Sequence, residues 1–159
     1  MNDESGRSTN PSTADHVGEA AGGIGGALAG AAIGATAGPI GSLLGGVAGA
    51  IGGWWSGRAL AEAAEDITDA DEQYYREQRA NSGSDHSFDD GARGAYYLGV
   101  VAAANPDYAG RNFADIESDL ARGWSAGASA HGAWTAVSPY AAMGYVRGIE
   151  RRRLPRRRA

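Results

Sequence analysis

The side chains that could carry out acid–base chemistry lie mostly in the segment of residues 86–125. Its polar candidates are one histidine, one arginine and four carboxylates: His86, Asp89, Asp90, Arg111, Asp115 and Glu117. Such groups act as general acids and bases when a concave pocket positions a substrate beside them. Two short helices in so small a segment offer little concavity. We therefore predict that the protein is not an enzyme, with no catalytic residue, no cofactor and no small-molecule substrate.

A run of carboxylates in residues 58–80 could suggest a cation site. Its members are Glu62, Glu65, Asp66, Asp69, Asp71, Glu72 and Glu77. The run lacks the Asp-x-Asp-x-Asp-Gly loop of an EF-hand. The chain also has no cysteine, which excludes disulfides and thiolate metal sites. We interpret the carboxylates as a solvated helix face and predict no metal site.

Arginine dominates the C-terminal segment. Residues 147–159 carry 7 Arg against one acidic residue, a balance of +6, whereas residues 1–146 carry 7 Arg against 18 Asp and Glu, a balance of −11. The residues expected to bind an anionic surface are Arg151, Arg152, Arg153, Arg156, Arg157 and Arg158. Three partners are open: anionic lipid, at about 1 kcal/mol per Arg near the surface, the chain's own acidic helix, and nucleic-acid phosphates. No aromatic residue interleaves with these arginines, which weakens the nucleic-acid interpretation.

The acidic and arginine-rich segments follow an apolar stretch, residues 18–57, which contains no charged residue between Glu19 and Arg58. Glycine recurs every four residues there, in two series whose helix-packing members are Gly22, Gly26, Gly30 and Gly34, then Gly41, Gly45, Gly49 and Gly53. Four residues is just over one helical turn, so each series forms a ridge where another helix can approach closely. Two arms of about 27 Å each approach the ~30 Å hydrocarbon thickness of a bilayer. We predict a membrane-embedded helical hairpin that reverses near Pro39.

The second arm of this hairpin is two-faced. Its large apolar side chains fall opposite the glycine ridge: Ile40, Leu43, Leu44, Val47 and Ile51. We expect the glycines to pack inward and the bulky side chains to face lipid. Trp54, Trp55 and Arg58 are typical of an anchor at the membrane interface. The first arm has few large aliphatics, so the two arms should insert together; a soluble oligomeric zipper and a disordered linker are the alternatives.

The flanking segments differ in character. Residues 1–17 are polar, lack the features of a signal peptide and are expected to be disordered. Residues 58–80 are predicted to form one amphipathic helix with an apolar stripe through Leu60, Ala64, Ile67, Ala70 and Tyr74. Residues 138–159 are predicted to form a helix that opens at Ser138-Pro139 and runs into the arginine tail.

Residues 86–125 have the best globular pattern in the chain. One helix is expected to run through Tyr96 and end at Asn105-Pro106, and a second is indicated by apolar residues spaced three and four apart from Phe113. The predicted core of this module is Tyr96, Tyr108, Phe113, Leu120 and Trp124. Such a pair could bury a small core with help from the preceding helix.

The same segment resembles a module of uncharacterised, stress-associated bacterial proteins that often adjoins glycine-zipper segments. The matching residues are His86, Phe88, Asp89, Asp90, Ala95, Tyr96, Gly99, Pro106, Tyr108, Gly110, Arg111, Phe113, Asp115, Ile116, Glu117, Leu120 and Trp124. Gly94 stands where the pattern usually has proline. The resemblance covers about 40 of the 159 residues. It implies a fold unit and a stress or envelope association, and it brings no catalytic residue.

Taken together, the sequence predicts an all-α protein with a glycine-zipper hairpin and a small helical module. We expect a membrane-associated structural or interaction protein of the bacterial inner membrane, with both termini cytoplasmic. Its expected partners are membrane lipid and further copies of the chain. A pore-forming or bilayer-perturbing oligomer and a soluble nucleic-acid-binding protein are the alternatives; the uncharged hairpin argues against a selective channel.

Overall fold

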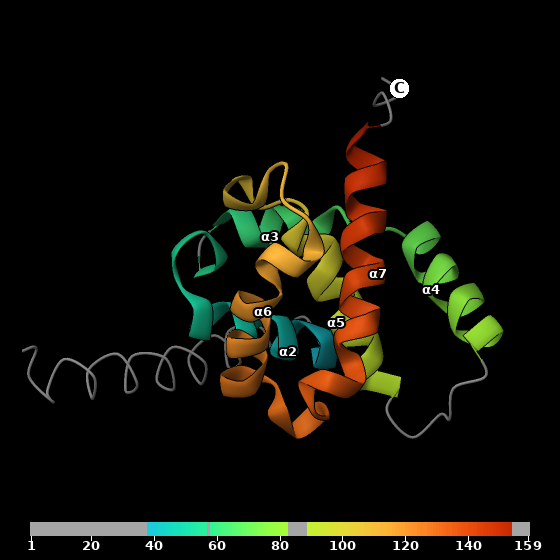
Figure 1. Ribbon diagram of the computed structural model, residues 1–159, viewed down its shortest axis with the longest axis horizontal. Coiled ribbons are helices and arrows are strands. Elements are labelled where there is room, and N and C mark those ends of the chain that lie inside the picture. The colour runs from blue at the N-terminus through green and yellow to red at the C-terminus, as the bar shows by residue number, and fades with distance from the viewer. Residues whose placement is uncertain (1–37, 57, 83–88, 154–159) are drawn as a thin grey trace, which may run out of the picture.

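A computed structural model describes residues 38–56, 58–82 and 89–153. Within these ranges the regular structure is helical, as the all-α prediction stated (Figure 1). The α-helices are α2 (Gly38–Ile51), α3 (Arg58–Glu65), α4 (Asp69–Ser82), α5 (Asp89–Ala102), α6 (Phe113–Gly127) and α7 (Trp134–Arg153). Short 3-10 turns connect them: η2 (Gly53–Ser56), η4 (Pro106–Tyr108) and η5 (Ser129–His131).

Helices α5 and α7 form the most extensive helix pair, and they run in the same direction because α6 returns the chain between them. Small residues let their backbones touch. A Cβ added at Gly144 would collide with the carbonyl of Tyr96, and one added at Gly99 would collide with the carbonyl of Ala141. Gly148, one turn after Gly144, lies against Val100 in the same way. Glycines spaced by four therefore permit close packing in this protein, here in α7 and outside the predicted series of residues 18–57.

Helix α2 packs antiparallel on α6 through a second glycine contact. Gly46 and Gly127 meet backbone to backbone, and Gly123 lies under the side chains of Val47 and Ile51. The apolar face of α2 is buried there, with Leu43 at 2% exposure and Val47 fully buried. Burying this face removes apolar surface from water, which is the main favourable term in such packing.

The orientation of α2 corrects the expectation for the second arm. Its bulky side chains face α5 and α6 and not lipid, because those helices supply a complementary apolar surface. The ridge of Gly41, Gly45 and Gly49 then falls on the opposite, partly exposed face of α2. Trp55 is also internal: its ring is 2% exposed and lies 6.2 Å from the ring of Tyr108. This placement differs from the interfacial anchor expected for it.

Four of the five side chains predicted for the module core are buried, and they share that core with α2 and α7. Tyr96 and Leu120 are fully buried, Trp124 is 1% exposed and Tyr108 is 5% exposed. Phe113 is partly buried and packs against this cluster. The residues of 86–125 that the structure describes thus form part of a larger bundle.

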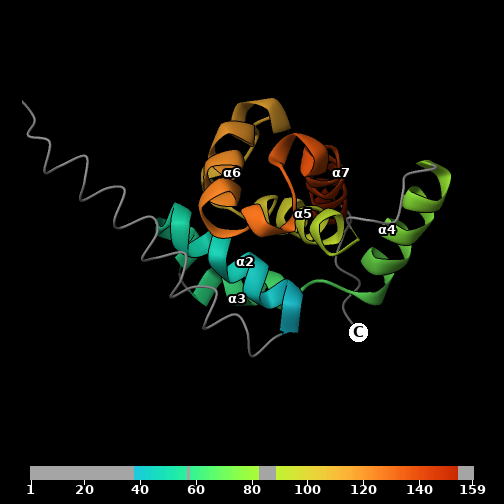
Figure 2. The same cartoon turned by 90° about the horizontal axis from the view of Figure 1, so that it is seen from below.

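The acidic segment divides into two helices. Helix α3 ends at Glu65. Thr68 precedes the first residue of α4, and its backbone N–H and hydroxyl both donate to the Asp71 carboxylate at 2.9 Å, which stabilises the start of that helix. The most buried residues of α4 are Asp71, Tyr75 and Arg79. Of the predicted stripe, Leu60, Ile67 and Tyr74 are partly buried against the core, whereas Ala70 is exposed. Helix α4 lies at the edge of the bundle in both views (Figures 1 and 2).

Helix α7 begins four residues before its predicted start. It opens at Trp134 and contains Pro139 inside its second turn. The early start is stabilised by packing: the rings of Trp124 and Trp134 lie 6.0 Å apart, and Val137 is 1% exposed. Pro139 is the sixth residue of α7, beyond the first four amides that lack a helical acceptor, so its ring removes one backbone hydrogen bond from the helix.

Several expectations concern residues outside the described ranges. These are the disordered tail of residues 1–17, the first glycine arm, and the terminal arginines Arg156, Arg157 and Arg158. The side chain of Arg58 also lies outside the description. Among the helices that the structure does describe, none is long and apolar enough to cross a membrane.

Candidate functional site

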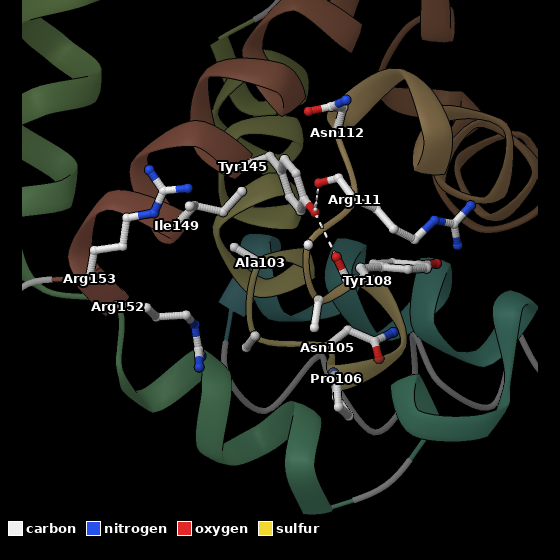
Figure 3. Close-up of a pocket in the computed structure, with 13 residues that line it drawn as sticks. Ala103, Asn105, Pro106, Tyr108, Arg111, Asn112, Tyr145, Ile149, Arg152 and Arg153 are labelled. Atoms are coloured by element: carbon white, nitrogen blue, oxygen red, sulfur yellow. Dashed lines mark hydrogen bonds between the residues drawn. The ribbon is translucent and has the colours of Figure 1, made fainter.

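A groove of about 530 Å³ opens where α5 ends, beside the last two turns of α7 (Figure 3). Its lining residues come from the loop after α5 and from α7: Ala103, Ala104, Asn105, Pro106, Tyr108, Ala109, Gly110, Arg111, Asn112, Tyr145, Ile149, Arg152 and Arg153. Small and aliphatic side chains form much of the wall, and arginines stand on both sides. Such a site suits a ligand with an apolar body and a negative charge.

The groove is shaped by one tyrosine hydroxyl. Tyr145 of α7 donates to the carbonyl oxygens of Arg111 at 2.9 Å and Tyr108 at 3.2 Å, as the dashed lines in Figure 3 show. Asn105 fixes the other end of the loop, because its side-chain oxygen accepts from the amide of Asp107 at 2.9 Å. Burial raises the pKa of both the Tyr145 and the Tyr108 hydroxyl. Both therefore stay protonated at neutral pH, and neither is suited to act as a base.

The arginines at the groove have different surroundings. Arg152 and Arg153 leave the end of α7 as exposed side chains and point in different directions (Figure 3). Arg111 extends from the opposite wall, with its guanidinium 5.7 Å from the centre of the Tyr108 ring. It donates to the backbone carbonyl of Asp115 at 2.5 Å.

Arg151 differs from its neighbours in the predicted anion-binding set. Its guanidinium donates to the Asp71 carboxylate at 2.5 Å and to the backbone carbonyl of Asp66 at 2.6 Å. This contact matches the interpretation in which the tail meets the acidic segment of the same chain. The sequence carried one signal for it, the spacing of Arg147 and Arg151 by one helical turn, which places both on the face toward α4.

The acid–base candidates that the structure describes do not converge on one point. Asp115 accepts from the amide of Asn112 at 3.0 Å and so closes the first turn of α6. Glu117 accepts from the indole of Trp134 at 3.3 Å. Asp90 is exposed, whereas His86 and the side chain of Asp89 lie outside the description. Asp115 and Glu117 therefore support the fold through these bonds, and the candidates within residues 90–153 do not assemble a catalytic pair.

No group of three or more metal-ligating side chains occurs in residues 38–56, 58–82 and 89–153. Comparisons of the chain with protein families, curated proteins and solved structures found no match. The resemblance of residues 86–125 to a stress-associated bacterial module stays a prediction.

Proposed function

We propose that this protein is a membrane-associated structural or interaction protein that self-associates through its glycine ridges and performs no chemistry of its own. The observation that carries the proposal is the outward ridge of Gly41, Gly45 and Gly49 on α2, opposite the buried Leu43 and Val47. A ridge without side chains permits another helix to approach at short distance.

The division of α2 into two faces refines the hairpin hypothesis. Because Leu43, Leu44 and Val47 belong to the core of the bundle, the second arm contributes its glycine face to association and its bulky face to the fold. Residues 20–37 remain an uncharged stretch whose own glycines continue the spacing of four. They are the segment proposed to meet lipid or a second copy.

The exposed arginines favour an anionic membrane surface as the place where the protein self-associates. Arg152 and Arg153 are exposed at the end of α7, and three more arginines follow in the sequence. Each arginine held near an anionic leaflet contributes about 1 kcal/mol. The proposed location is the cytoplasmic face of a bacterial inner membrane, with the bundle of α2 to α7 displayed beside it; the stress or envelope role comes from the resemblance alone.

Crosslinking in native membranes, followed by alkaline carbonate extraction, tests location and self-association together. We expect crosslinked oligomers that stay with the membrane pellet. Gly45→Leu should remove the oligomers, because its side chain fills the ridge while the buried face of α2 is unchanged. Ala126→Leu is the matched control, since Ala126 is an exposed small residue on α6, away from the ridge.

The unfolding midpoint of both variants in urea separates association from folding. Gly45→Leu should keep or raise the stability of the monomer, because leucine favours a helix interior by about 1 kcal/mol relative to glycine. Release of the wild-type protein as a soluble monomer would refute the proposal. Oligomers of Gly45→Leu equal to those of the wild type would refute the ridge as the interface.

A further inference from the structure

Helix α4 is held on the bundle by charged and aromatic side chains in place of a close backbone contact. Its centre is Asp71, which is fully buried and lies between two arginines of α7. Nη1 of Arg151 is 2.5 Å from one carboxylate oxygen, and Nε of Arg147 is 3.4 Å from the other. About a quarter of each arginine side chain is exposed. A single negative charge therefore faces two positive charges.

Aromatic rings continue this contact along α4. The ring of Tyr75 lies 5.3 Å from that of Tyr96 on α5 and 6.2 Å from that of Tyr140 on α7. The guanidinium of Arg147 lies 4.8 Å from the centre of the Tyr74 ring. Asp71 and Tyr75, one helical turn apart, are thus two of the buried side chains by which α4 contacts the facing surfaces of α5 and α7.

A second ionic contact stands at the border of this face. Glu72 accepts from Nε of Arg93 at 2.9 Å and from the hydroxyl of Tyr97, both on α5. Burial works against the charged form of Glu72, but the bonds from Tyr97 and Arg93 outweigh it and hold its pKa below the ordinary value. Burial and the bond to Glu72 raise the pKa of Tyr97 to about 12.

The contact is incomplete in its hydrogen bonding. The buried hydroxyl of Tyr96 has no hydrogen-bond partner among the described residues. One carboxylate oxygen of Asp71 and Nε of Arg147 also make no hydrogen bond, but they form an ion pair with each other at 3.4 Å. Tyr96 is fully buried, and after burial itself the Asp71 charge is the largest influence that raises its pKa. A buried polar group without a hydrogen bond destabilises the contact that buries it. The face under α4 therefore offers a hydroxyl donor, that of Tyr96, which α4 does not use.

We propose that the α5–α7 face formed by Tyr96, Tyr140, Arg147 and Arg151 is a binding site for an acidic helix of another protein, and that α4 is its internal, displaceable occupant. The partner helix carries a carboxylate in its first turn and an aromatic residue four positions later, as Asp71 and Tyr75 do. This inference does not depend on residues 18–37 or on the proposed self-association.

Competition with α4 sets the apparent affinity for such a partner. A site that is open only in a fraction of molecules binds its ligand more weakly by that fraction. Removing the Asp71 charge weakens the internal occupant and leaves the receptor residues intact. A partner that accepts a hydrogen bond from Tyr96, and that turns the ion pair with Arg147 into a hydrogen bond, gains bonds that α4 does not make, so its binding shifts the population toward the open state.

The test uses a fluorescent peptide of residues 66–82 and the full chain. The peptide should bind the Asp71→Asn chain at least about tenfold more tightly than the wild-type chain, measured by anisotropy. A peptide that itself carries Asp71→Asn should bind neither chain. Adding Arg147→Gln and Arg151→Gln to the Asp71→Asn chain should abolish binding of the wild-type peptide.

Hydrogen exchange on the same chains shows whether α4 is displaced. Asp71→Asn should reduce the protection of α4 and leave that of α5 and α7 unchanged. Unchanged protection of α4, equal peptide affinity for both chains, or binding that survives loss of the two arginines would each overturn the proposal. Absence of peptide binding to a chain whose α4 has lost its protection would also overturn the proposal.

Two further measurements keep the result interpretable. If Asp71→Asn lacks cooperative unfolding, Tyr75→Ala opens the contact from its aromatic end and serves as the receptor instead. Dimerisation of the Asp71→Asn chain that Arg147→Gln abolishes would make a second copy the occupant and would overturn the assignment to a different protein. Loss of oligomers in the Gly45→Leu chain leaves all of these outcomes unchanged, so the two proposals fail separately.

Discussion

Helix α7 meets two of its neighbours, α5 and α4, in opposite ways. Toward α5 it presents Gly144 and Gly148, and the two backbones are in contact. Toward α4 it presents Tyr140, Arg147 and Arg151, and long side chains span the distance between the helices. One helix therefore carries a close apolar contact and an ionic, aromatic contact on different faces (Figure 2).

The difference teaches which contact can open. Close packing between α5 and α7 has no tolerance for added volume, because interiors are filled to the density of organic crystals. The α4 contact depends on charges that water can also solvate once the helix moves, so its loss costs less than the loss of an apolar core. We expect α5 and α7 to unfold only globally and α4 to open locally.

The largest effect is expected from Gly144→Ala. The new methyl group collides with the carbonyl of Tyr96, and neither backbone can move without separating α5 from α7. The change should lower the free energy of unfolding by about 3 kcal/mol or more, although alanine alone would favour the helix by about 1 kcal/mol. Urea denaturation measures it.

A matched control lies in the same helix. Val146 is 52% exposed, so Val146→Ala should change the free energy of unfolding by less than about 0.5 kcal/mol. If Gly144→Ala were as stable as this control, the close contact of α5 with α7 would not be what holds the bundle together.

The next effect is expected from Tyr75→Ala. It removes the ring between Tyr96 and Tyr140 and should cost about 2–4 kcal/mol of local stability. Because α4 opens by itself, its amides should lose protection while those of α5 and α7 keep theirs. Hydrogen exchange followed by mass spectrometry measures this. Equal loss of protection in all three helices would show that α4 belongs to the same cooperative unit.

The contrast between the α5 and α4 contacts of α7 also explains which features could be predicted from sequence. Helix type and the core positions Tyr96, Leu120 and Trp124 followed from apolar residues at helical spacing, because burial imposes that period. The contact of α4 could not be found this way, since two of its three buried residues, Asp71 and Arg79, are charged. Only their distant partners make such residues internal.

The spacing of the glycines correctly predicted a helix over α2, but it led to the wrong prediction of which face of that helix is buried. Spacing by four identified α2 as a helix with two faces, and the structure describes it as one. Which face is covered depends on α6, and nothing local in residues 38–51 specifies that partner. Gly46, which lies outside the series, makes the close contact with Gly127.

A smaller effect is expected from lowering the pH at the border of the α4 contact. The pKa of Glu72 is depressed in the folded protein, so its ionised form contributes stability above the unfolded pKa of 4.5. This contribution is lost as the pH falls through the lower folded pKa. Protection of α4 amides, corrected for intrinsic exchange, should therefore hold from neutral pH down to about 4.5 and fall as the pH is lowered further.

Glu72→Gln provides the comparison for that titration. This variant should show weaker α4 protection at neutral pH and a smaller loss on acidification, because the charge-assisted bonds to Arg93 and Tyr97 are already weakened. If both chains lost α4 protection in parallel, Glu72 would not contribute to the acid sensitivity.

The smallest effect is expected from Gly45→Ala. This variant is informative because it can be compared with Gly46→Ala, one position later. Gly45 belongs to the partly exposed ridge of α2, so alanine there should change the free energy of unfolding by less than about 1 kcal/mol, in the stabilising direction. Alanine at Gly46 brings its methyl group to 2.5 Å from the carbonyl oxygen of Gly127 and should destabilise the fold. Urea denaturation of the two monomers compares them. Equal destabilisation would mean that both faces of α2 are closely packed, and that the outward ridge is already occupied within a single chain.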